Sequence, residues 1–427
     1  MTMDGTLQAP PADQETAETL DRDQRAKEIR AVEARLEMRH DRNGNVIGPK
    51  RTALNLDRIV RHDPFFVRKI RLNGLVETVE WAGDRLRDDH VTWIRLAIAD
   101  TYGLEYAFAT VQEVVCAIAR QRTYHPVHRF LTRIRWDGVE RIDRYLVDYI
   151  GAADTDLHRE LSRRFFVSCV ARAMGRGLKP VKVDTVLILV GPQGARKSTS
   201  FRTLAGSEWF SDTALDIRNK DSLMTIRGPW LFELSELQGT RAREAETVKA
   251  FLSAETDRYR PPYARNVIES HRQVVFVGTT NESSFLADPT GARRFWPVTV
   301  GEIDLEAIKR DRSMLWAEAV AAYRAGEPWW LSPGRDAQLR DAQEQYRHED
   351  PWQAAIEQWM EEAPNQNRAG RGLRIADVLV DVLDMDTDKQ GKHHEMRLGG
   401  VLQSMGWTKR RRVRGGGGRV MVWYPPD

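Results

Sequence analysis

The sequence lacks long apolar runs and contains very few cysteines. No run approaches the about 18 apolar residues that cross a bilayer, which excludes a membrane-spanning protein. Cys116 and Cys169 cannot form a disulfide framework or a zinc cage. Residues 1–24 lack the basic and apolar segments of a secretory signal. We therefore expect a cytoplasmic protein that does not bind membranes.

The chain also lacks an excess of charge of either sign. Its 65 Lys and Arg residues against 62 Asp and Glu residues leave a net charge of +3, which neither requires nor excludes nucleic acid as a partner. With 41% hydrophobic and 30% charged residues, the composition is typical of a globular protein. At roughly 150 residues per domain, the 427 residues indicate about three domains.

Changes in pattern along the chain predict four segments. Residues 1–45 are polar and highly charged, so we expect a disordered or solvated segment with one helix near Asp21–Met38. Residues 46–178 show helical periodicity and predict a helical domain. Residues 179–335 alternate strand and helix patterns, and residues 336–427 form a C-terminal domain.

The third segment contains short apolar runs that are typical of buried strands. Val186–Val190 is rich in β-branched residues, and similar runs occur at Trp230–Phe232 and Val274–Val277. Helical patterns separate the three runs. This alternation predicts an α/β core with a parallel sheet.

The C-terminal segment has the outline of a winged helix. We expect a charged helix at Asp336–Glu349, a loop at Asn365–Gly372, and helices at Ile375–Leu383 and Met396–Met405. Four glycines, Gly415–Gly418, then separate a basic segment from an apolar one, which predicts a hairpin.

The most informative segment follows the first buried strand and precedes a helix, which is where a phosphate-binding loop lies. Glycines let backbone N–H groups approach phosphate oxygens, Lys197 would reach the β- and γ-phosphates, and Ser198 would bind Mg²⁺. Arg196 stands where the pattern expects Gly, so a simple turn and a true loop with weak hydrolysis remain alternatives. The candidate nucleotide contacts are Gly191, Gly194, Ala195, Arg196, Lys197, Ser198 and Thr199.

Polar residues follow the other two predicted strands. Glu233 and Glu236 could hold Mg²⁺ or orient the attacking water, with Glu233 the better candidate for the metal. Asn281 could hydrogen-bond the γ-phosphate or the water. The alternatives are two solvated acids and a turn-forming asparagine.

Three basic segments could contact phosphates. Arg293 and Arg294 could reach a neighbouring subunit's γ-phosphate, which requires an oligomer, or they could be a salt-bridged pair. Residues 258–265 interleave arginines with tyrosines, as in proteins that track single-stranded DNA, although a surface loop or a subunit interface has the same composition. Lys409, Arg410, Arg411 and Arg412 precede the glycines, where they could contact duplex DNA or form a solvated face.

Taken together, these motifs resemble those of the virulence-associated E family, which are phage- and island-encoded relatives of the superfamily 3 helicases within the AAA+ ATPases. The similarity runs from about residue 50 to the end and is densest at 124–330. The matching strings lie at residues 124–127, 136–139, 191–199, 209–212, 220–221, 233–237, 258–263, 278–281 and 288–296.

The resemblance implies a hexameric, ATP-driven DNA helicase or primase-helicase for a mobile element, with ATP and Mg²⁺ as cofactors. It implies Walker B acids at Glu233 and Glu236, a sensor at Asn281 and an arginine finger at Arg293 or Arg294. It also implies that Lys249, Arg260 and Arg265 face DNA, and it leaves replication proteins open as partners. No primase-like residue set is present in residues 1–120. A nucleotide-dependent initiator or scaffold with little hydrolysis, or a monomeric P-loop kinase, would also fit the loop.

Overall fold

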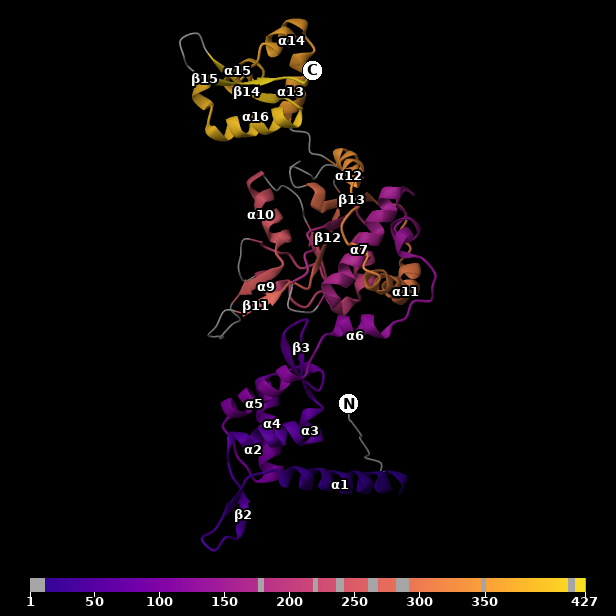
Figure 1. Cartoon of the computed structure of the whole chain (residues 1–427), viewed down its shortest axis with the longest axis vertical. Coiled ribbons are helices and arrows are strands. Elements are labelled where there is room, and N and C mark those ends of the chain that lie inside the picture. The colour runs from indigo at the N-terminus through magenta and orange to yellow at the C-terminus, as the bar shows by residue number, and fades with distance from the viewer. Residues whose placement is uncertain are drawn as a thin grey trace, which may run out of the picture. The chain divides into compact units, whose positions relative to one another are not determined.

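The computed structural model describes residues 12–175, 180–217, 222–235, 242–259, 268–281, 292–346, 351–413 and 419–426 (Figure 1). The chain divides into two compact units, Met1–Asp137 with Leu223–Trp230, and Gly138–Ser222 with Leu231–Asp427. Among the helices in these described ranges, none is long and apolar enough to cross a membrane.

The first unit packs helices around an apolar core. Helix α2 begins after Thr52, whose side chain caps it by accepting from the Asn55 N–H. Its inward face contributes Leu56 and Ile59 to the core, where they are fully buried. The helices of this unit are α1 (Ala12–Glu33), α2 (Ala53–His62), α3 (Pro64–Val67), α4 (Asp88–Tyr102), α5 (Phe108–Gln121), α6 (Pro126–Arg133) and most of α9 (Ser222–Thr225).

This unit also contains strands that the prediction of a helical segment leaves out. Each has only two to four residues, too few for a period of two to stand out beside longer helical patterns. A small sheet has the order β5-β4-β3-β6, and β1 pairs with β2 as a separate antiparallel hairpin. The strands are β1 (Met38–His40), β2 (Val46–Pro49), β3 (Ile70–Asn73), β4 (Thr78–Trp81), β5 (Asp84–Arg85) and β6 (Thr123–Tyr124).

The second unit is built on a five-stranded parallel sheet with the order β13-β7-β12-β9-β8. Every residue of β7 (Val186–Val190) is buried, as expected for a strand covered on both faces. The other strands of this sheet are β8 (Phe210–Ser211), β9 (Leu231–Ser235), β12 (Val275–Thr280) and β13 (Phe295–Thr299).

The three strands expected from the sequence are therefore present as β7, β9 and β12, and the parallel sheet is confirmed. Two further strands were not expected from the sequence: β8, which has two residues, and β13, which contains Pro297. Because proline cannot donate a hydrogen bond, it is tolerated in an edge strand, and β13 is at the edge of the sheet.

Helices pack on this sheet and on each other through large aromatic side chains. The Phe166 ring of α7 lies 5.0 Å from the Trp316 ring of α11, and the Trp316 indole N–H donates to Leu204 O of α8 at 2.9 Å. The remaining elements are η1 (Ile142–Arg144), η2 (Tyr145–Tyr149), α7 (Asp156–Met174), α8 (Lys197–Ala205), η3 (Ser207–Trp209), α10 (Ala242–Ser253), β10 (Thr256–Tyr259), β11 (Ile268–His271), η4 (Ala292–Arg294), α11 (Leu305–Arg324) and α12 (Arg335–Glu344).

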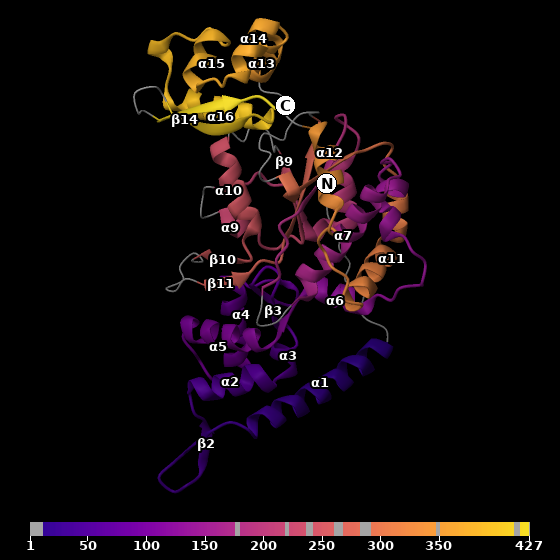
Figure 2. The same ribbon diagram turned by 45° about the horizontal axis from the view of Figure 1, so that its top comes forward.

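The described residues at the end of the chain form four α-helices, one short 3-10 helix and an antiparallel pair of strands, seen at the top of Figure 2. The loop expected at Asn365–Gly372 is wrong, because residues 363–370 are helical. Pro364 stands in the first turn of this helix, where a proline is well tolerated. The elements are α13 (Pro351–Met360), α14 (Ala363–Gly370), α15 (Ile375–Asp381), η5 (Thr387–Lys389), α16 (Lys392–Ser404), β14 (Thr408–Val413) and β15 (Arg419–Tyr424).

Candidate nucleotide site and basic surfaces

The glycine-rich loop joins β7 to α8 and is held firmly at its start. The Gly191 N–H donates to Thr280 O at 3.1 Å, which ties the loop to the end of β12. A Cβ at Gly191 would lie 2.6 Å from Val300 Cγ2, so a side chain there would force Val300 to shift. Arg196 has φ 61° and ψ 24°, the left-handed conformation that a glycine would adopt without strain. The expected glycine is absent, but its backbone conformation is retained.

Lys197 begins α8 and points its amine back into the loop. The Nζ donates to Gly191 O at 2.8 Å and to Pro192 O at 2.9 Å, and the residue is only 8% exposed. This burial lowers the pKa of the Lys197 amine, while the charge of Glu233 acts in the opposite direction. A cation is therefore held inside a loop whose N–H groups lie at a helix N-terminus.

Glu233 lies in β9 beside the loop and is 2% exposed. Its Oε1 accepts from the Ser198 hydroxyl at 2.8 Å and also from the Thr279 hydroxyl of β12. Its Oε2 is buried and has no hydrogen-bond partner among the described residues. Thr279 was not among the residues expected from the sequence, although its place near the carboxyl end of β12 was a signal for it.

The other two polar candidates are Asn281 and Glu236. Asn281 follows β12 directly and is exposed. Glu236 lies outside the described residues, so the structure gives it no place. Of the two candidates that the structure describes, Glu233 is the one that its contacts join to Ser198 beside Lys197.

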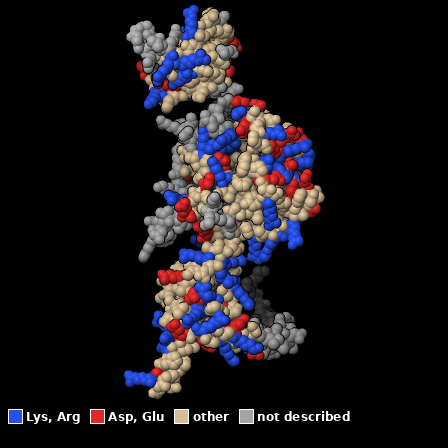
Figure 3. Space-filling model, in the orientation of Figure 1, with Lys and Arg blue, Asp and Glu red and all other residues tan. Residues whose placement is uncertain are grey.

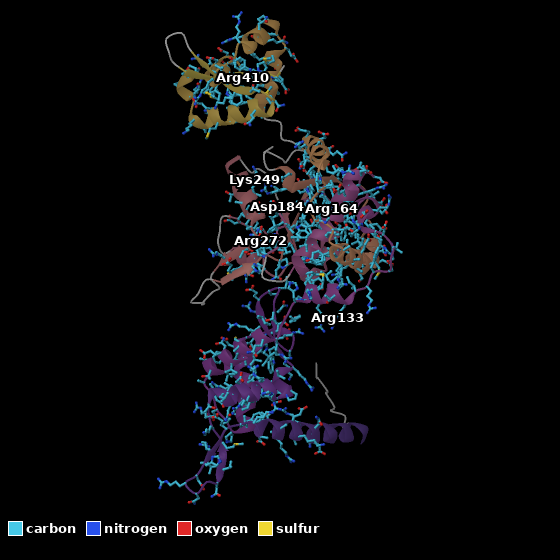
Figure 4. All side chains as sticks on the ribbon, in the orientation of Figure 1. Arg133, Arg164, Asp184, Lys249, Arg272 and Arg410 are labelled. Atoms are coloured by element: carbon cyan, nitrogen blue, oxygen red, sulfur yellow. The ribbon has the colours of Figure 1, made fainter. Side chains whose placement is uncertain are left out.

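Arg293 and Arg294 differ sharply in their surroundings. The Arg294 guanidinium donates to Ser253 Oγ at 3.1 and 3.0 Å and lies 3.5 Å from the Asp184 carboxylate. Arg293 is exposed and makes no hydrogen bond or ion pair within the part of the chain that the structure describes. Asp184, labelled in Figure 4, precedes β7, so Arg294 connects η4 to the segment that leads into the central sheet.

The basic–aromatic segment lies partly in an antiparallel hairpin, β10–β11, with Arg258 paired to Glu269 across the strands at 3.0 Å. At its base, Arg272 is buried and paired with Asp257 at 2.5 Å. Lys249 is half-buried on α10 (Figure 4). Arg260 and Arg265 lie outside the described residues.

The base of this hairpin is joined to α7 by a second arginine. Arg172 donates to Arg272 O at 3.0 Å and to Val183 O at 2.9 Å. Burial lowers the pKa of Arg172 to about 9, and the charge of Arg272 acts in the same direction. Two arginines therefore hold the hairpin against the segment that leads into β7.

The C-terminal basic cluster lies on β14, where Lys409, Arg410 and Arg411 are exposed (Figures 3 and 4). The Lys409 amine lies 5.7 Å from the ring centroid of Trp423, on the partner strand. For Arg412 the structure describes only the backbone, which pairs with Val420.

These features define a mixed α/β protein with a parallel sheet and a lysine–serine–glutamate cluster beside β7. Within the described ranges, no group of three or more His, Cys, Asp or Glu residues could hold a metal ion by itself.

Residues 131–348, about half of the chain, match the virulence-associated protein E-like domain. The chain therefore belongs to this family, which confirms the resemblance seen in the sequence.

Among solved structures, the chain is similar to the apo structure of the NrS-1 C terminal region (305-718), with 10% identity and a TM-score of 0.46, covering 85% of this chain and 99% of that one. It is also similar to the A form apo structure of the NrS-1 C terminal region-CTR, with 11% identity and a TM-score of 0.38, covering 69% and 78% of the two chains. Comparison with curated proteins finds no match.

Proposed function

We propose that this protein is an ATP-hydrolysing DNA helicase or translocase that serves the replication of a phage or mobile genetic element. The observation that supports this most is the contact of Ser198 with Glu233 at 2.8 Å, beside the loop that holds Lys197. A buried carboxylate, a hydroxyl and an amine gathered at one loop are the groups that phosphoryl transfer needs.

The loop residues fit a bound nucleotide with its metal. Lys197 would exchange the carbonyls of Gly191 and Pro192 for phosphate oxygens, while the N–H groups of the loop bind the others. The Ser198 hydroxyl and the unpaired Oε2 of Glu233 are suitable groups for Mg²⁺ or its water. Mg²⁺ would neutralise developing phosphate charge, and the phosphates themselves would complete its ligands, because no described cluster could hold a metal alone.

Glu233 is also the best candidate for activating water. Thr279 and Ser198 both hold its Oε1, so the carboxylate has a fixed orientation and its Oε2 is left to accept a proton. Asn281, just beyond β12, would contact the γ-phosphate or the water. Glu236 stays a second candidate from the sequence.

The arginine finger is assigned to Arg293. Arg294 is held by Ser253 and Asp184, whereas Arg293 is exposed and without a described partner, so only Arg293 is available to a neighbouring subunit's nucleotide. The proposal therefore includes a homo-oligomeric ring, with a hexamer as the expected state. It also includes an AAA+ core at 179–335.

DNA would be tracked by the segment that includes Lys249 and the β10–β11 hairpin, through phosphate contacts and base stacking. The C-terminal segment 336–427 would act as a winged-helix-like domain in which Lys409, Arg410 and Arg411 contact duplex DNA.

The test is ATP hydrolysis by the purified chain with Mg²⁺, with and without single-stranded DNA. We expect hydrolysis that DNA stimulates and that Lys197→Ala abolishes. No turnover under any condition, with ATP binding intact, would instead favour a nucleotide-dependent initiator or scaffold. The left-handed Arg196 is the observation that favours this second candidate, since strain in the loop could slow hydrolysis.

A further inference from the structure

The β1–β2 hairpin of the first unit has no role in the function proposed above. It projects away from the helices of its unit as a bare two-stranded ribbon (Figure 1). Isolated two-stranded hairpins are marginally stable in water, so a projecting one that is kept ordered needs specific supports. This hairpin has them at both ends.

A buried amide holds the base of the hairpin. Asn55, on α2, is fully buried; its side chain donates to Glu37 O at 2.9 Å and to Lys50 O at 2.8 Å. The same side chain accepts from the Glu37 N–H at 2.8 Å. One side chain therefore joins the two strands where they leave the unit, and it fixes the direction in which they project.

A second side chain shapes the tip. The Asp41 carboxylate accepts from the N–H groups of Asn43 and Asn45, each at 2.8 Å, and from the Asn45 side chain at 3.0 Å. These bonds lower the pKa of Asp41, the side-chain bond with Asn45 most of all. Gly44 supplies the left-handed turn conformation, with φ 86°. Because the Asp41 carboxylate accepts these hydrogen bonds within the turn, it forms no ion pair with the nearby arginines among the described residues.

The cations of the hairpin are exposed and unpaired. Arg39, Arg42, Lys50 and Arg51 are all exposed, and none of the four makes an ion pair among the described residues. Lysine and arginine side chains are visible at the tip in Figure 3. The ribbon is therefore a concentration of positive charge on a narrow, ordered support, which suits the phosphates of DNA.

Between these cations lies an exposed aliphatic pair. Val46 is 61% and Ile47 is 55% exposed. As successive strand residues they point to opposite faces of the ribbon, so each face presents one apolar side chain beside the cations. A two-stranded ribbon fits a DNA groove, and proteins that bend DNA insert such apolar side chains between base steps.

We propose that the β1–β2 hairpin is a DNA-binding arm that grips duplex DNA through Arg39 and Arg42 and inserts Val46 or Ile47 between bases. This proposal does not depend on ATP hydrolysis. A second copy of the chain is a less suitable partner for the hairpin than DNA, because pairing two identical hairpins would bring like charges together. Two aliphatic side chains without an aromatic are also a small anchor for a lipid surface.

The first experiment measures binding of the full chain to a fluorescent duplex without nucleotide, as salt is varied. The double variant Arg39→Ala/Arg42→Ala loses two phosphate contacts, so its plot of log K against log salt should be less steep than that of wild type, by about 1.8. At about 150 mM salt, this difference corresponds to about 30-fold weaker binding. The matched control is Arg87→Ala/Arg120→Ala, which removes two exposed arginines elsewhere in the same unit. Equal slopes for the two double variants would overturn the proposal.

The second experiment tests insertion with 2-aminopurine in the duplex, whose fluorescence rises when bases unstack. Val46→Ser/Ile47→Ser is expected to keep the wild-type salt slope and to lose this rise. A wild-type rise in this variant contradicts insertion. If the native mass of this variant differs from that of wild type, the partner of the hairpin is a second copy of the chain. If the wild-type protein sediments with phosphatidylserine vesicles and the variant does not, the partner is a lipid surface. Either result overturns the proposal.

Discussion

Replacing Glu233 by glutamine separates nucleotide binding from hydrolysis. The amide oxygen can keep the position of Oε1 and accept from Ser198 and Thr279 as before. The amide NH₂ then stands where the unpaired Oε2 was, in nearly the same volume. The fold and the loop should therefore be preserved, while the negative charge that accepts a proton from water is lost.

The expected effect follows from the role of a general base. Such groups contribute about 10²- to 10⁴-fold to rate, or about 3–5 kcal/mol in the activation barrier. We expect Glu233→Gln to lose hydrolysis by this factor and to bind ATP within a few-fold of wild type. Phosphate release in a single turnover measures the chemical step, and a fluorescent ATP analogue measures binding.

Two comparisons make this result specific. Glu302→Gln makes the same chemical change at an exposed carboxylate of the same unit and should leave both measurements unchanged. Lys197→Ala should weaken nucleotide binding as well as hydrolysis. If Glu233→Gln hydrolyses ATP at close to the wild-type rate while Lys197→Ala is inactive, the assignment of Glu233 as the base is wrong.

Three further outcomes are expected. Arg196→Gly relieves a left-handed residue at about 1–2 kcal/mol but adds backbone entropy of about 0.5–1 kcal/mol to the unfolded chain, so stability should rise by at most about 1.5 kcal/mol in urea unfolding. Its hydrolysis rate should stay close to wild type, and a large increase would favour the weakly hydrolysing initiator. Arg293→Ala should lower hydrolysis by about 10³-fold, far more than Arg294→Ala. When the Arg293→Ala and Lys197→Ala proteins are mixed in equal amounts, up to about a quarter of the sites should regain activity, because such a site has Lys197 from one subunit and Arg293 from its neighbour. A finger that acts within its own subunit would give no such recovery. Gly151→Ala should lower the free energy of unfolding by at least about 2 kcal/mol, because the new Cβ would lie 2.7 Å from Glu302 N. The control is Gly326→Ala, at a glycine that is also left-handed but has open space around it. Equal losses of stability in the two variants would contradict the clash.

Strands β7, β9 and β12 of the central sheet could be predicted from the sequence because each contains a buried apolar run. Val186–Val190 has no polar residue, so only a position inside the protein suits it. The short strands of the first unit lack such a pattern. β5 has two residues, Asp84 and Arg85, and both are exposed. Their pairing is decided by the elements around them, which no local pattern encodes.

The residues of the candidate site also differ in whether the sequence alone identifies them. Lys197, Ser198 and Glu233 could be found from the sequence, because each lies next to a recognisable glycine-rich loop or apolar run. Thr279 could not be distinguished from Thr280, since the choice between two neighbouring threonines depends on the face to which each points. The difference between Arg293 and Arg294 depends on Ser253, which is 41 positions from Arg294 in the chain.

Arg196 shows what a sequence pattern does and does not test. The pattern asks for glycine, but the loop needs a residue with positive φ at the start of α8, and Arg196 has it. The surrounding structure can impose this conformation, because the loop is tied to β12 through Gly191 and its other end is the first turn of a helix. A cost of about 1–2 kcal/mol is small beside the apolar burial of a five-stranded core. A mismatch in residue type at this position is therefore compatible with an intact loop. Whether the loop supports hydrolysis then depends on the groups proposed to face the phosphates, Lys197, Ser198 and Glu233, more than on Arg196.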